Sequence, residues 1–138
     1  IWRSMLKVFI DTNILISAAL NLNNTPGQAF FKAVTYPNKA IICEQNLDEL
    51  RQIFNRKFPN KLATLEAFLA IALNTISIVP TPDAEHESEN AIRDVMDRPI
   101  LRAAINANAD VFLTGDKDFL ESGLSHPRMM TAAEFLQL

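Results

Sequence analysis

The segment LKVFIDTN, residues 6–13, decides the fold class of this chain, because an apolar run ends at an aspartate and a helical pattern follows directly. An apolar run as short as Leu6–Ile10 predicts a buried strand. From Ile14 to Ala19 the apolar residues then recur at helical spacing. A buried strand that leads at once into a helix is typical of α/β proteins with a parallel sheet.

The rest of the chain continues this alternation. Pro26 is placed to open a helix that extends to Val34, and Thr131 with Glu134 forms a capping box for the final helix. The most polar connection, residues 80–90, is expected to be a loop or a short acidic helix with an exposed His86 that has no role. Further strands are predicted at 39–43, 75–79, 110–114 and 128–130, and further helices at 45–74 with a joint at Pro59, at 100–108, and after the turn 115–118 up to Gly123. We therefore predict a three-layer α/β/α fold around a mostly parallel sheet of four to five strands.

Length and composition limit the organisation of the chain. Its 138 residues are near the commonest size of one domain and 49% are hydrophobic, so we expect one domain over residues 5–138. Met5 is the expected natural start, with residues 1–4 a cloning remnant or an upstream extension. No run approaches the roughly 20 apolar residues of a membrane helix, and no secretory signal is visible. The one cysteine, Cys43, cannot form an intramolecular disulfide, which fits a reducing cytoplasm.

The charge balance restricts how the chain could hold nucleic acid. A formal net charge of −3 argues against binding by bulk electrostatics alone. It does not exclude a nuclease, because a metal site needs local negative charge. Arg93, Arg98, Arg102 and Lys117 lie close in sequence to several acids, so they form a candidate basic rim for phosphates, or else an ordinary solvated face.

Two aspartates fall where predicted strands end. Asp11 closes the first strand and Asp116 follows the fourth. In an open parallel sheet, ligands bind at the carboxyl ends of the strands, where connections diverge to opposite faces. The competing interpretation is helix capping, because Asp is a favoured N-cap residue and a helix follows each one.

Two more acids belong to predicted helices. On a helical wheel Glu49 lies beside Ile53 and so borders the buried stripe, whereas Asp48 points away. Asp97 precedes a helix that begins at Pro99 and can share its inner face. Asp94 is the competitor of Asp97, with a surface ion pair to Arg98 as its ordinary role.

Taken together, these four acids predict a metal centre. The topology places Asp11, Glu49, Asp97 and Asp116 near one edge of the sheet. Two like charges about 4 Å apart repel by roughly 1 kcal/mol in water and about 4 kcal/mol at an effective dielectric of 20. A divalent cation removes that penalty, and Mg²⁺ or Mn²⁺ suits a set of carboxylates without His or Cys.

The sequence resembles the PIN-domain family in four places that occur in the family's order and spacing. These are VFIDTN at 8–13, LDEL at 47–50, Arg93-Asp94 with Asp97, and TGDKDF at 114–119. The resemblance extends from about Met5 to Leu138. It implies a metal-dependent ribonuclease, often the toxin of a bacterial or archaeal toxin–antitoxin pair, with an antitoxin that blocks the acidic cleft and with a homodimer as the assembly.

The resemblance also implies roles for individual residues. Asp11, Glu49, Asp97 and Asp116 would be the catalytic, metal-binding acids, with Asp118 an auxiliary ligand. Asn13 and Thr114 would orient Asp11 or the water held by the metal, and Asp94 would support them. Arg93, Arg98 and Lys117 would contact the RNA. Val95 stands where this branch often has proline, which leaves the choice between Asp94 and Asp97 as ligand open.

The expected reaction is hydrolysis of an RNA phosphodiester by an activated water, with Glu49 and Asp97 completing the metal shell or accepting the proton. A non-catalytic module that binds RNA or protein is the first alternative, and the intact acids argue against it. Phosphoryl transfer through an aspartate, with Lys117 as partner, is the second. Asn13 stands where that chemistry expects a second Asp.

Overall fold

The computed structural model describes residues 5–138, so the expectation for residues 1–4 lies outside the described residues. Five strands form one sheet in the order β3-β2-β1-β4-β5, and every neighbouring pair is parallel. The strands are β1 (Lys7–Ile10), β2 (Lys39–Cys43), β3 (Ile76–Val79), β4 (Val111–Leu113) and β5 (Arg128–Met130). The α-helices are α1 (Thr12–Leu20), α2 (Thr25–Val34), α3 (Glu44–Lys57), α4 (Leu62–Ala72), α5 (Arg98–Asn106), α6 (Lys117–Leu120) and α7 (Ala132–Leu136). Three 3₁₀ turns complete the set: η1 (Pro59–Lys61), η2 (Glu87–Ala91) and η3 (Val95–Asp97).

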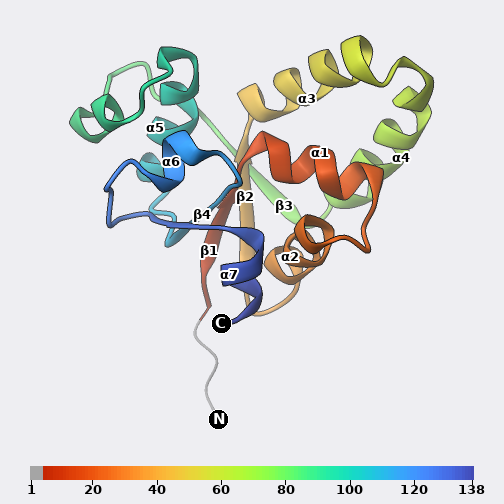
Figure 1. Cartoon of the computed structure of the whole chain (residues 1–138), viewed down its shortest axis with the longest axis horizontal. Coiled ribbons are helices and arrows are strands. Elements are labelled where there is room, and N and C mark those ends of the chain that lie inside the picture. Colours follow the sequence, from red (N-terminus) through yellow and green to blue (C-terminus); the bar gives the residue numbers. More distant parts are fainter. Residues whose placement is uncertain (1–4) are drawn as a thin grey trace.

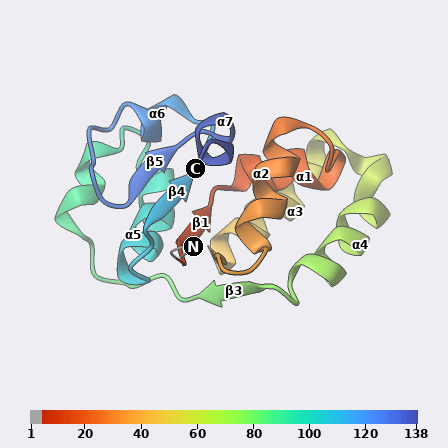
Figure 2. The same cartoon turned by 90° about the horizontal axis from the view of Figure 1, so that it is seen from below.

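The predicted α/β/α architecture is confirmed, with a sheet that is parallel throughout. Helices cover both faces of the sheet, as Figures 1 and 2 show from two directions. Along β1, Val8 and Ile10 belong to the apolar cluster shared with α1, α2, α3, α4 and α7. Phe9 belongs to the opposite cluster, which α5 and Phe119 of α6 help to form. Because successive strand residues point to opposite faces, each central strand must be apolar on both sides, which explains its unbroken hydrophobic run.

Local differences from the prediction concern short elements. The turn expected at 115–118 ends early, because Asp116 caps a helix that already begins at Lys117. The acidic connection contains the 3₁₀ turn η2. His86 is exposed as expected, and its Nδ1 accepts a hydrogen bond from the Ser88 amide at 3.1 Å, which caps η2. No helix within residues 5–138 is long and apolar enough to cross a membrane.

The neighbouring strands β1 and β4 determine where the candidate site lies in the fold. In the register of β1 and β4, Phe9 faces Phe112 and Ile10 faces Leu113. The two phenyl rings stack with centroids 5.5 Å apart. The strands therefore end level with each other, and the following helices, α1 and α6, pack against opposite faces. This divergence is the position where open α/β sheets bind ligands.

A buried ion pair anchors the long connection between β3 and α5. The Arg102 guanidinium donates to both carboxylate oxygens of Glu89, at 2.7 and 2.8 Å, and to the carbonyl of Pro82 at 2.9 Å. Glu89 is 2% exposed, and the hydrogen bonds from Arg102 lower its pKa to about 2. The assignment of Arg102 to a basic rim is therefore wrong, because its guanidinium is engaged by Glu89 and by the Pro82 carbonyl.

Replacing Glu89 by Gln should strongly destabilise the protein. The substitution leaves the partly buried Arg102 guanidinium without its charged partner, so the free energy of unfolding should fall by clearly more than it does for an exposed acid of the same turn. Urea unfolding monitored by circular dichroism would measure the loss. Glu87→Gln, an exposed neighbour in the same turn, should change the free energy of unfolding by less than about 0.5 kcal/mol. Equal stabilities for the two variants would contradict this account of the connection.

Candidate metal centre

Asp11 lies at the junction between β1 and α1. Its backbone amide continues the sheet by donating to the Leu113 carbonyl at 2.9 Å. Its Oδ1 accepts the hydrogen bond from the Thr12 amide that caps α1, at 2.8 Å. Asp11 is 6% exposed. The capping role considered from the sequence is therefore real, but a cap alone does not require a carboxylate that is buried this deeply.

Thr114 joins Asp11 to Asp116. The Thr114 hydroxyl donates to Oδ2 of Asp11 at 2.7 Å and accepts from the Asp116 amide at 3.0 Å. Thr114 is fully buried. Asp116 caps α6, with its Oδ1 accepting from the Asp118 amide at 2.9 Å. One hydroxyl thus fixes the carboxylate after β1 and the backbone after β4.

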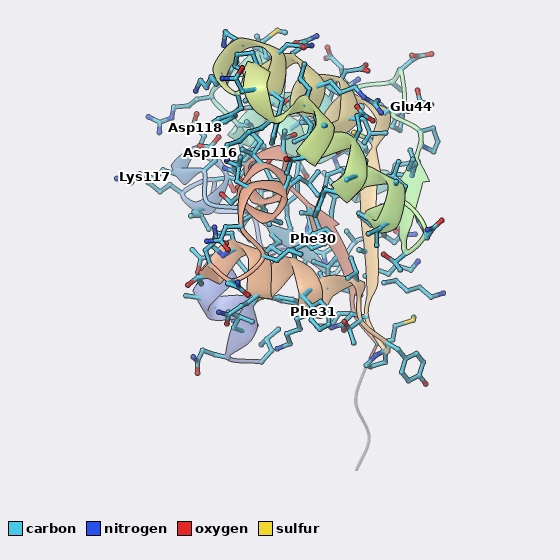
Figure 3. All side chains as sticks on the ribbon, turned by 90° about the vertical axis from the view of Figure 1, so that its right-hand side faces the viewer. Phe30, Phe31, Glu44, Asp116, Lys117 and Asp118 are labelled. Carbon is cyan, nitrogen blue, oxygen red and sulfur yellow. The ribbon has the colours of Figure 1, made fainter. Side chains whose placement is uncertain are left out.

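Three further carboxylates meet beside Asp11. Asp97, Asp116 and Asp118 each offer a carboxylate oxygen, and these oxygens lie within 4.8 Å of one another. Asp97 comes from the turn η3, and the other two flank Lys117 at the start of α6. Lys117 extends outward between them (Figure 3). Three segments that are separate in the sequence therefore supply one group of carboxylates, which we call the acid cluster: Asp11, Asp97, Asp116 and Asp118.

Glu49 and Asp94 border the acid cluster. Glu49 is half-buried on α3, and Asp48 is exposed, as the helical wheel predicted. Glu49 and Asp94 each raise the pKa of Asp97 by their charge, so both carboxylates are close enough to act on it. Asp94 is exposed, and its Oδ1 accepts from the Met96 amide at 2.9 Å. The two sides of the site, α3 and η3, therefore face each other.

The pKa values show a site with excess negative charge. Burial raises the pKa of Asp11 to about 7, with smaller contributions from the charges of Asp97 and Asp116. Burial, followed by the neighbouring carboxylates, raises the pKa of Asp97 to about 6. The pKa of Glu49 is also raised, mainly by burial, although hydrogen bonding by Gln45 and Thr12 lowers it.

A divalent cation fits the chemistry of these residues. The donors are all carboxylate oxygens, which suit Mg²⁺ and Mn²⁺. The raised pKa values of Asp11, Glu49 and Asp97 indicate that the folded protein must either take up protons or receive positive charge from outside. The only ion pair to the acid cluster within residues 5–138 is between Arg93 and Asp118, at 2.7 Å, and the Arg93 side chain is 77% exposed.

Metal-free protein should become more stable as the pH falls from about 8 to about 5.5. Asp11 and Asp97 have folded-state pKa values above their ordinary ones, so their contribution is fully present at low pH and is lost as the pH rises through about 6 and about 7. Thermal denaturation in EDTA would show a higher Tm at the lower pH. Added Mn²⁺ should raise the Tm chiefly at pH 8. A Tm that falls on acidification over this range would contradict the charge balance described here.

The other residues predicted for the site have fewer contacts with the acid cluster. Asn13 is exposed, and no hydrogen bond joins its side chain to Asp11 within residues 5–138, so Thr114 and not Asn13 holds that carboxylate. The expected pair of Asp94 with Arg98 is absent from the same residues. Arg98 instead donates from Nε to the Ile92 carbonyl at 2.9 Å. Arg93 and Lys117 are exposed beside the acid cluster.

The sequence analysis missed two polar residues that support the site, Asn46 and Gln45. Asn46 is fully buried, and its amide donates to the Thr12 hydroxyl at 3.0 Å and accepts from the Cys43 amide at 2.8 Å. Gln45 donates to Glu49 at 3.1 Å. A polar residue just after the end of a strand was the available signal for Asn46, and a spacing of four residues on a helix was the signal for Gln45.

Comparisons with known proteins show the family and the fold of this chain. A family model described as "PIN domain" matches residues 7–118, a span that contains every acid of the site. The uncharacterized protein MJ1680 of Methanocaldococcus jannaschii is 27% identical over 146 residues, which cover 96% of this chain and 90% of that protein. The crystal structure of VapBC2 from Rickettsia felis, bound to a DNA fragment from their promoter, matches with a TM-score of 0.66 at 18% identity, over 91% of this chain and 97% of that chain. At that identity the structural match shows a common fold.

Proposed function

Because the chain belongs to the PIN-domain family, we propose that it is a ribonuclease that hydrolyses RNA phosphodiester bonds with Mg²⁺ or Mn²⁺ bound at the acid cluster. The observation that carries the proposal is the meeting of Asp97, Asp116 and Asp118 within 4.8 Å, beside the buried Asp11. Carboxylates this close together repel one another and destabilise the folded state unless a cation neutralises their charge. The residues needed for the reaction therefore occur together, at the position where this type of sheet binds ligands.

In this proposal each carboxylate has a defined task. Asp11, Asp97, Asp116 and Asp118 hold the ion, and Thr114 keeps Asp11 oriented towards it. When bound, a divalent cation lowers the pKa of water and stabilises charge on the scissile phosphate.

Glu49 faces the acid cluster from α3 and accepts the proton of the attacking water. Its raised pKa suits this task, because a base works best when its pKa is close to the working pH. Asp94 contributes negative charge from the rim. Arg93, Arg98 and Lys117 surround the acids and bind the RNA phosphates, with Lys117 the most free to do so because it extends outward (Figure 3).

An RNA cleavage assay tests the function. Purified protein should cleave single-stranded RNA with Mn²⁺ and stop in EDTA, and adding Mn²⁺ back should restore the rate. Cleavage that persists in the chelator would refute the metal mechanism. Protein that binds RNA without binding Mn²⁺ in calorimetry would support the alternative of a non-catalytic binding module.

The proposal extends to partners. Family resemblance suggests the toxin of a toxin–antitoxin pair, with a cognate antitoxin and a homodimer, and the lone Cys43 suggests a cytoplasmic location. Exposed apolar side chains on α2 and α4 support a protein partner, with Phe31 65% and Ile71 75% exposed beside a groove of about 600 Å³. Light scattering after size exclusion tests the dimer, and a monomer at micromolar concentration would exclude it.

A further inference from the structure

We propose that Gln45 is a positioning residue that sets the distance between Glu49 and the turn carrying Asp97. This role rests on the proposed function and adds to it a residue outside the acids and their known supports. Gln45 is half-buried in the first turn of α3, four residues before Glu49. It therefore lies on the same helix face as Glu49, at the side where α3 approaches η3.

The Gln45 amide joins two segments that are far apart in the chain. Its Nε2 donates to Oε1 of Glu49 at 3.1 Å and to the carbonyl oxygen of Met96 at 3.1 Å, across 51 residues of sequence. Both partners are acceptors without a proton to give, so only the amide nitrogen, with its two hydrogens, satisfies them together. A single side chain thus ties the proposed base to the residue next to Asp97.

The turn η3 leads directly into α5, which holds it on that side, whereas the contact described between η3 and α3 is polar. Val95 is 60% and Met96 is 71% exposed, so the turn has little apolar burial of its own. Its internal contacts, from the Met96 amide to Asp94 and from the Asp97 amide to the Asp94 carbonyl, fix its shape. They do not fix its distance from α3. The hydrogen bond from Gln45 to Met96 supplies that restraint.

Two consequences follow from losing the Gln45 amide. The turn becomes free to move away from α3. The Asp97 carboxylate then moves away from those of Asp116 and Asp118, which weakens metal binding. The Glu49 carboxylate also loses a donor that orients it, which lowers the rate of the chemical step. Partners that orient metal-binding or reacting groups typically contribute 10- to 100-fold in affinity or activity.

Gln45→Met tests the inference, because methionine keeps the length and the helical preference of glutamine but cannot donate a hydrogen bond. Gln52→Met is the matched control, since Gln52 is exposed on the same helix. We expect the Mn²⁺ dissociation constant from calorimetry to rise at least tenfold in Gln45→Met and to stay unchanged in the control. In RNA cleavage kcat should fall while KM stays near the wild-type value. In a Glu49→Gln background, the further loss of kcat from Gln45→Met should shrink, because the proposed base that Gln45 orients is already absent.

The outcomes separate this inference from the proposed function. If the wild-type protein binds Mn²⁺ and Gln45→Met binds it equally well with the same kcat, Gln45 has no positioning role and the nuclease proposal stands. If both substitutions reduce kcat equally, the effect belongs to the helix and the inference is overturned. If the wild-type protein binds no Mn²⁺, the proposed function fails and this role fails with it.

Discussion

RNA cleavage is expected to fall by more than about a hundredfold when Asp116 is replaced by Asn, with the fold intact. The reason is that Asn serves as an N-cap about as well as Asp does, so α6 keeps its cap while the acid cluster loses one negative charge. Loss of even an indirect metal partner costs 10- to 100-fold, and a direct ligand should cost more. Asp11→Asn should behave in the same way, because its cap on α1 is likewise retained. Initial rates with saturating Mn²⁺, together with circular dichroism, measure the effect.

Asp48→Asn is the matched control for this pair of substitutions. Asp48 lies on α3 next to Glu49, but its side chain is exposed. Its replacement should leave the cleavage rate within about twofold of wild type. Full activity in Asp11→Asn and Asp116→Asn would mean that these aspartates are caps and nothing more, which is the structural alternative that the sequence left open.

Replacing Thr114 by Val should damage both stability and activity. Valine has nearly the same shape, but it neither donates to Asp11 nor accepts from the Asp116 amide. A buried group left without its hydrogen bond costs about 1–3 kcal/mol, and loss of a partner that orients a metal ligand typically costs 10- to 100-fold in activity. Urea unfolding and cleavage rates at several Mn²⁺ concentrations would measure the two effects separately.

Thr114→Ser provides the comparison for Thr114→Val. Serine retains the hydroxyl and loses only a buried methyl group, so its cleavage rate should stay within a fewfold of wild type, with a loss of stability of about 1 kcal/mol. A valine variant as active as the serine variant would show that the hydroxyl bridge between Asp11 and Asp116 has no part in the reaction.

Most of the fold was predictable because the inner strands are short and apolar on both faces and helical patterns alternate with them along the chain. The strand over 39–43 and the strand over 128–130 match β2 and β5 residue for residue, and the capping box before α7 is formed as the spacing predicted. The connection between β3 and α5 was not predictable in this way. Its order comes from Glu89 and Arg102, a pair that local sequence patterns cannot identify because the partners are 13 residues apart and lie in different elements.

The acids of the candidate site could be predicted from the sequence, but the residues that hydrogen-bond to them could be predicted only in part. A parallel sheet brings the ends of β1 and β4 together whatever the details of packing, so Asp11 and Asp116 had to lie near each other. The partners of these acids depend on side-chain direction, which the sequence does not specify. Asn13 and Thr114 were both expected to orient Asp11 or the water held by the metal; Thr114 holds Asp11, and the role of Asn13 towards that water stays a prediction. Gln45 and Asn46 were overlooked because glutamine and asparagine near a helix start are usually solvated.

The central claim is that the acid cluster holds one cation, with Asp97, Asp116 and Asp118 in direct contact with it and Asp11 beside them. A crystal structure of the protein grown with Mn²⁺, with anomalous diffraction data, tests this claim most directly. We predict an anomalous peak in contact with carboxylate oxygens of Asp97, Asp116 and Asp118. Crystals of cleavage-competent protein with no peak among these carboxylates, or with Mn²⁺ bound only elsewhere, would contradict the account.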